Sequence, residues 1–166
     1  FFFFWPERAI SWRHQLDHFG RLGYFAVAPD MRCYGYSRIY TNHSDYAVEH
    51  AVEDMRELLS HLDRSSAIWV GHDWGSPVVW GLAAHYPQLC SRVANLCVPY
   101  LPNGFTLDSL IPLIDRERYP VNSYPAGQWD YFLYYREQFA RAQAVMQANV
   151  EATVKIFFCK GKPLAP

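Results

Sequence analysis

Short apolar runs alternate with segments of helical periodicity through the first hundred residues. Residues 24–28 (YFAVA), 67–70 (AIWV) and 92–98 (RVANLCV) are apolar and bounded by turn-forming residues, as buried strands are. A further apolar run at residues 1–5 reads as the end of another strand, closed by Pro6. Four such strands separated by helices predict an α/β fold: a parallel sheet with right-handed crossovers and helices on both faces.

Three segments carry the signals of helices. The first is marked by apolar residues spaced three or four apart: Ala9, Trp12, Leu16 and Phe19. In the second, apolar residues between positions 48 and 62 form one face, and Ser44 or Asp45 can cap its start. The third covers about residues 76–86, where Pro77 suits the first turn because an N–H there has no helical partner to lose.

The pattern changes after residue 98. Five of the 11 prolines fall within residues 99–125, which predicts an irregular excursion over the carboxyl edge of the sheet. Residues 127–158 are rich in aromatic side chains and predict one or two helices. We therefore expect a sheet core over residues 1–98 and a separate region over residues 99–166.

Composition narrows the class of protein. The 166 residues are 51% hydrophobic and 19% charged, which supports a packed core and excludes a disordered chain. A net charge of -1 gives no sign of a nucleic-acid or anionic-membrane partner, and no apolar run approaches the ~18 residues of a membrane helix. The four cysteines form no CxxC pair or zinc pattern, which favours reduced thiols in an intracellular, cytoplasmic protein without a metal.

Residues 71–77 read GHDWGSP and directly follow the apolar run at residues 67–70. Gly71 and Gly75 have the spacing of a nucleophile elbow, G-x-S-x-G, in which Asp73 takes the place of the serine. Small residues are needed on both sides because this strand–turn–helix connection is strained and crowded. Asp73 could instead serve only as a helix N-cap, but that role would not explain the two glycines.

A carboxylate at this position is suited to attack on an alkyl carbon. Asp73 is ionised at neutral pH, so it needs no base to attack, and the product is an ester of the enzyme. Cleavage of that ester by water does need a base, and N–H donors must stabilise the charge that develops on its carbonyl. We expect one donor at the N–H of Trp74 and the other in the loop after the first strand, at Trp5.

Several segments together resemble the soluble epoxide hydrolase branch of the α/β-hydrolase family, over about residues 5–158. The most specific are GHDWG, WPE with SWRHQ, and PDMR-x-YGYS. The resemblance implies a partial α/β-hydrolase core and part of a helical lid. It also implies a small-molecule epoxide as substrate, converted to a vicinal diol through an ester at Asp73, with no metal or organic cofactor. Trp74 and Trp5 would form the oxyanion hole.

The same resemblance implies a tyrosine in the lid that protonates the epoxide oxygen. The segment DYFLYYRE maps this role onto Tyr131, with Tyr134 and Tyr135 as rivals. Ordinary aromatic packing in a lid helix would account equally well for all three. The role of Tyr131 is therefore a prediction from the family and not from the spacing of these residues.

The chain departs from the family pattern at several positions. Phe3-Phe4-Trp5-Pro6 stands where the family has His-Gly-x-Pro, and Cys33 stands where the family usually has glycine. The family's acid and base His follow the lid, whereas no histidine here lies after His85. We therefore expect this chain to carry out at most the first half-reaction, formation of the Asp73 ester.

Two other functions are compatible with the sequence. Haloalkane dehalogenases share the HDWG elbow, but they usually place Asn before the Pro where this chain has Trp5. A non-catalytic fragment, or a binding protein that uses the pocket without chemistry, is the other alternative.

Overall fold

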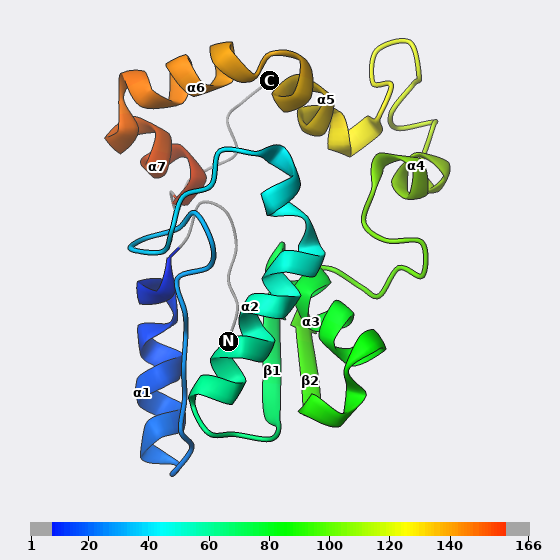
Figure 1. The fold of residues 1–166 in the computed structure, drawn as a ribbon. Helices are drawn as coiled ribbons and strands as arrows, with labels where there is room; N and C mark the ends of the chain where they lie inside the picture. Colours follow the sequence, from blue (N-terminus) through cyan, green and yellow to red (C-terminus); the bar gives the residue numbers. More distant parts are fainter. Residues whose placement is uncertain (1–7, 159–166) are drawn as a thin grey trace. The chain divides into compact units, whose positions relative to one another are not determined.

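The computed structural model describes residues 8–158 of the chain (Figure 1). The chain divides into two units, Phe1–Gly104 and Phe105–Pro166. The expected strand at residues 1–5, and Trp5 with it, lie outside the described residues.

A parallel pair of strands forms the centre of the first unit (Figure 1). Strand β1 spans Ala67–His72 and β2 spans Cys90–Leu96, so two of the predicted strands are confirmed with slightly shifted ends. In their register, Gly71 lies opposite Asn95 and His72 lies opposite Leu96. This register brings the carboxyl end of β2 beside the residues that follow β1.

The prediction of a strand at residues 24–28 is wrong for the described part of the chain. No strand is assigned there, and the sheet formed by residues 8–158 has two strands. An apolar run becomes a strand only when its backbone pairs in register with a neighbour, and hydrophobicity alone does not specify that neighbour.

Three helices accompany the sheet in this unit. Helix α3 (Gly75–His85) connects β1 to β2 and packs against both strands, and α2 (Val48–His61) packs against α3. Helix α1 (Arg13–Arg21) follows a 3-10 turn, η1 (Ala9–Trp12). All three predicted helices are therefore confirmed, and Pro77 lies in the first turn of α3 as expected.

The start of α2 differs from the prediction. Ser44 and Asp45 lie in a separate 3-10 turn, η2 (His43–Tyr46), and the helix begins after Ala47 without a side-chain cap. Arg32 instead joins this segment to α2. Its guanidinium donates to the carbonyl of Asp45 in η2, to both oxygens of Asp54, each at 2.7 Å, and to the carbonyl of His50 at 3.2 Å. A bidentate, charge-assisted hydrogen bond of this kind is stronger than the hydrogen bond of a neutral capping side chain.

Apolar side chains from α2, β1 and α3 make the core of the first unit. Val79 and Leu82 of α3 are fully buried, and Trp69 of β1 is buried with its indole N–H donating to the carbonyl of Leu89 at 2.9 Å. The other core residues are Trp12, Met31, Ala51, Val52, Met55, Leu59 and Val78. Because α3 is buried along most of its length, the turn at its start has little freedom to move.

The second unit is helical, with short 3-10 turns. Its helices are α4 (Leu107–Leu110), α5 (Asp130–Glu137), α6 (Phe139–Ala148) and α7 (Val150–Phe158). Residues 127–158 thus hold three α-helices where one or two were predicted. The helical backbone is interrupted at Gln138 (φ -123°, ψ 32°) and Asn149 (φ -151°, ψ 87°), and no proline or glycine marks either break.

The remaining 3-10 turns are short connections. They are η3 (Pro87–Leu89) before β2, η4 (Ile111–Leu113) after α4, and η5 (Gly127–Trp129) before α5. Among residues 8–158, no helix combines the length and apolar character needed to cross a bilayer.

Candidate active site at the turn between β1 and α3

Asp73 lies in the two-residue turn between the end of β1 at His72 and the start of α3 at Gly75. Its φ is +50°, a left-handed conformation that is uncommon for a residue with a side chain. Two backbone hydrogen bonds hold it there: its N–H donates to the carbonyl of Leu96 at 3.1 Å, and its carbonyl accepts from Ser76 N–H at 2.9 Å. The turn therefore has the strained geometry that a nucleophile elbow requires.

The space beside Gly71 explains why this position is glycine. A Cβ at Gly71 would lie 2.6 Å from Oδ1 of Asn95, 2.7 Å from the carbonyl oxygen of Gly75 and 2.8 Å from Cα of Ser76. Ser76 is itself fully buried, and its hydroxyl donates to the carbonyl of Leu96 at 3.3 Å. Strand β1 and the first turn of α3 are thus packed at backbone contact, with no room for a side chain between them.

The Asp73 carboxyl is half-buried, and this burial raises its pKa above the ordinary value of 3.8. A hydrogen bond from the backbone N–H of Trp74 and the charge of His72 act in the opposite direction and lower the pKa. Attack on a carbon would convert the partly desolvated carboxylate into a neutral ester. The cost of desolvating the charge is then relieved as the bond forms.

Tyr34 is a second partly buried ionisable group in the electrostatic environment of Asp73. Burial, with smaller contributions from the negative charges that Cys33 and Asp73 carry when ionised, raises the pKa of its phenol to about 12. The phenol therefore stays protonated at neutral pH. Cys33 beside it has a φ of +72°, so the position at which the family usually has glycine does adopt the left-handed conformation that suits glycine.

The predicted site residues that the structure describes lie in two places: Asp73 and Trp74 between β1 and α3, and Tyr131 on α5. Trp74 directly follows Asp73, and its N–H is directed at the Asp73 carboxylate. Trp5, the expected second oxyanion donor, lies outside the described residues. Tyr131 belongs to the second unit, on α5, where its ring meets those of Phe132 at 4.5 Å and Tyr135 at 6.0 Å between centroids. Asp73 and Trp74 are thus the predicted site residues that share one element junction.

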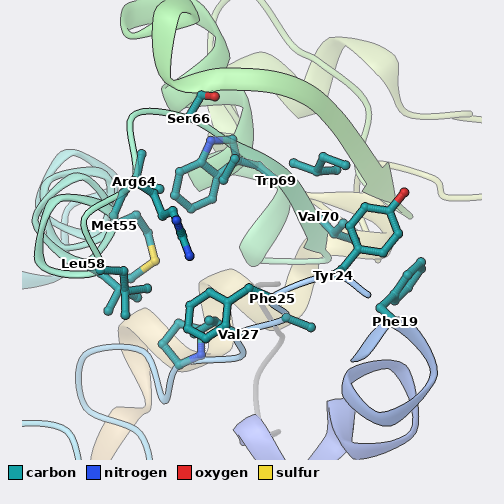
Figure 2. Close-up of a pocket in the computed structure, with 16 residues that line it drawn as sticks. Phe19, Tyr24, Phe25, Val27, Met55, Leu58, Arg64, Ser66, Trp69 and Val70 are labelled. Atoms are coloured by element: carbon teal, nitrogen blue, oxygen red, sulfur yellow. The ribbon is translucent and has the colours of Figure 1, made fainter. Parts of the chain in front are cut away.

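A cavity of about 330 Å³ lies elsewhere in the first unit (Figure 2). Its walls are mostly apolar and include Trp69, Met55 and Leu58, while Arg64 projects toward the ring of Phe25 with its guanidinium carbon 5.6 Å from the ring centroid. The cavity runs along Ser66 and residues 67–70 of β1, and Asp73 is not among its lining residues. Because ligands of parallel sheets bind at the carboxyl ends of the strands, we do not assign it to the substrate.

The described residues give no support for a protein-bound metal. No group of three or more His, Cys, Asp or Glu side chains among residues 8–158 is placed to hold an ion.

Sequence reasoning missed three residues that surround the turn. Leu96 and Asn95 act from β2, and nothing in the sequence signals which residues of a neighbouring strand lie opposite Gly71. Tyr34 lies within the segment PDMR-x-YGYS, one of the segments that carry the family resemblance. Its partial burial and its electrostatic interaction with Asp73 depend on how residues 29–47 fold, which the motif does not specify.

Comparison with known proteins agrees with this geometry. The family model described as the alpha/beta hydrolase fold matches residues 5–151. The bifunctional epoxide hydrolase 2 of Sus scrofa is 33% identical over 153 residues, which is 92% of this chain and 26% of the pig protein. Epoxide hydrolase A of Mycobacterium tuberculosis is 39% identical over 99 residues, 60% of this chain and 31% of the bacterial protein.

The chain is also similar to solved structures of epoxide hydrolases. The epoxide hydrolase VrEH1 of Vigna radiata is 33% identical, with a TM-score of 0.62 over 71% of this chain and 40% of that one. Epoxide hydrolase A of Mycobacterium thermoresistibile is 38% identical, with a TM-score of 0.59 over 63% of this chain and 33% of that one. The chain spans about a quarter to a third of the length of the curated relatives it matches. With its family match and its elbow between a parallel strand and a helix, the chain belongs to the α/β-hydrolase fold family.

Proposed function

We propose that Asp73 is the nucleophile of an epoxide hydrolase reaction. One observation carries the proposal: a half-buried carboxylate is held at φ +50° between a parallel strand and a buried helix, beside the N–H of Trp74. The names of the similar proteins, which are epoxide hydrolases, support the choice of an epoxide as substrate.

In the first step, an Asp73 oxygen attacks one carbon of the epoxide ring. The bond between that carbon and the epoxide oxygen breaks, its electron pair passes to the oxygen, and the oxygen takes up a proton. The product is a hydroxyalkyl ester of Asp73. We assign the proton to the phenol of Tyr131, as the resemblance implies.

In the second step, water adds to the ester carbonyl and the diol leaves with the regenerated carboxylate on the enzyme. The N–H of Trp74, together with that of Trp5, would stabilise the oxyanion that forms in this step. Water needs a base to attack, and residues 86–166 contain no histidine. We therefore assign residues of this chain to the first step alone, and expect the ester to accumulate in a preparation of these 166 residues.

The test is incubation with an aryl epoxide followed by mass spectrometry of the peptide that contains Asp73. We expect that peptide to gain the mass of one epoxide molecule, with no gain in the Asp73→Asn variant. Repeated formation of diol by this chain would contradict the proposed restriction to the first step. No adduct in the wild type, or an equal adduct in Asp73→Asn, would contradict the assignment of the nucleophile.

The same assay separates the three tyrosines of α5. Tyr131→Phe should slow formation of the adduct, whereas Tyr134→Phe and Tyr135→Phe, which remove the same atom from neighbouring positions, should leave the rate unchanged. An effect confined to one of the other two variants would reassign the proton donor. Release of halide from a haloalkane, with no adduct from epoxides, would favour the dehalogenase function instead.

A further inference from the structure

Asn95 has a side chain that the proposed mechanism does not use. It lies on β2 directly opposite Gly71, and Gly71 lies two residues before the proposed nucleophile, Asp73. Its amide nitrogen and oxygen are both buried, and neither has a hydrogen-bond partner among the described residues. A buried amide without partners lowers the stability of the folded protein, so its contacts call for a specific explanation.

One hydrogen-bond acceptor, the carbonyl oxygen of Gly75, faces the same narrow space beside Gly71 as the Asn95 amide. Oδ1 of Asn95 and the carbonyl oxygen of Gly75 lie 2.6 Å and 2.7 Å from one point, the position that a Cβ on Gly71 would take. In this orientation the amide presents its oxygen, and not its NH₂ group, on the side of the Gly75 carbonyl. Rotating the amide by about 180° exchanges nitrogen and oxygen without changing its shape, and the two orientations are distinguished by hydrogen bonding alone.

We propose that Asn95 is a positioning residue for the nucleophile turn, with its amide NH₂ directed at the carbonyl of Gly75. A backbone carbonyl has two lone pairs, so that of Gly75 can accept from Asn95 as well as within α3. The contact holds the first turn of α3 against the end of β1, over the space that Gly71 leaves open.

The neighbouring residue completes the arrangement. The carbonyl of Leu96 accepts from the N–H of Asp73 at 3.1 Å and from the hydroxyl of Ser76 at 3.3 Å. Asn95 and Leu96 thus contact the turn from the same strand, one through its side chain and the other through its backbone. If the contact of Asn95 is lost, the turn that holds Asp73 at φ +50° loses one of its supports, and the carboxylate is presented less accurately to the substrate.

The test compares Asn95→Asp, which keeps the shape and removes the NH₂ donor, with Asn95→Ser, which keeps a shorter donor. Ser91→Ala is the control, because Ser91 is an exposed residue at the other end of β2. The inference rests on the proposed function, because the first readout is alkylation of Asp73 by an aryl epoxide at increasing concentration. A misplacement of about 1 Å can slow a reaction about a hundredfold.

We expect Asn95→Asp to lower the rate constant at saturating epoxide by about ten- to a hundredfold. The half-saturating concentration should stay unchanged, Asn95→Ser should recover part of the rate, and Ser91→Ala should match the wild type. Equal saturating rates in the wild type and Asn95→Asp would overturn the proposal, as would a change confined to the half-saturating concentration.

A second readout is independent of chemistry at Asp73. Amide hydrogen exchange measured by NMR should become faster at the N–H groups of Asp73 and Ser76 in Asn95→Asp, and stay unchanged in Ser91→Ala. If the wild type forms no adduct, the proposed function fails, and this exchange alone decides the role of Asn95. Unchanged exchange at both amides would then overturn it.

Discussion

Single residues in unusual backbone conformations mark the surroundings of the candidate site. Asp73 at φ +50°, Cys33 at +72° and Cys97 at +74° are residues with side chains in the left-handed region. The strain at Asp73 belongs to the turn that presents the carboxylate. Cys33 has no such role in the proposed reaction, so its strain should be removable without harm.

We expect Cys33→Gly to stabilise the protein. The left-handed conformation costs an L-residue roughly 1–2 kcal/mol, and Cys33 is exposed, so little packing is lost with its side chain. A gain of about 1 kcal/mol would raise Tm by about 2–4 °C in a chain of this size, measurable by circular dichroism. Cys33→Ala is the control, because it removes the thiol and keeps the strained φ; an equal gain from Cys33→Ala would show that the thiol, and not the backbone, is the cause.

The pKa of Asp73 predicts the pH dependence of its alkylation. Only the carboxylate attacks, and burial raises the pKa of this carboxyl. As pH falls, the nucleophile is therefore lost at a pH above the ordinary value of 3.8 for an aspartate. The rate of adduct formation, measured by mass spectrometry over a pH series, should show this midpoint. A midpoint at or below the ordinary value would mean that the charge of His72 and the N–H of Trp74 outweigh burial.

At the scale of elements, the junction of β1 and α3 depends on close backbone contact. Gly71 lies where strand, helix and the side chain of Asn95 meet within 3 Å of its missing Cβ. Two of the three contacts are with backbone atoms of α3, which is buried and cannot move aside. A methyl group added at Gly71 would therefore force β1 and α3 apart.

We expect Gly71→Ala to lower stability by about 1–3 kcal/mol, the usual cost of overpacking, and to abolish alkylation of Asp73. Gly20→Ala in α1 is the matched control, because a Cβ there has no atom within 4 Å and the change should be neutral or stabilising. Urea unfolding and the adduct assay measure the two effects. A Gly71→Ala protein with wild-type stability and reactivity would mean that β1 and α3 can separate at low cost.

At the scale of the whole molecule, the two units are unequally packed. The core of the first unit joins α2, β1 and α3, and includes the fully buried Val79 and Leu82. In the described part of the second unit, the buried apolar side chains are Leu110, Ile114, Ala126 and Ala142. Local stability follows buried apolar contact, so the units should open at different free energies.

We therefore predict that amide hydrogen exchange is slowest in β1 and α3 and much faster in α6 and α7. Val145 of α6 is 64% exposed, whereas Val79 of α3 is 0% exposed. Exchange followed by mass spectrometry resolves the two sets of peptides. Equal protection of both sets would contradict the prediction and indicate that the chain opens as one cooperative unit.

The features that could be predicted from the sequence depend on residues close together in the chain. Three helices, two strands and the turn at residues 71–77 could be predicted because periodicity, strand composition and glycine spacing act over a few residues. The family could be identified for the same reason, since its motifs are local. The helix breaks at Gln138 and Asn149 were not predicted, because no residue with a strong backbone preference marks them.

The surroundings of Asp73 depend on contacts between segments that are distant in the sequence. Strand register placed Asn95 and Leu96 beside the turn, and the folding of a distant loop placed Tyr34 in the environment of the carboxylate. These contacts join residues twenty or more positions apart, and their partners depend on how strands pair and helices pack. The identity of the candidate nucleophile is thus a property of the local sequence, whereas its pKa and its support are properties of the fold.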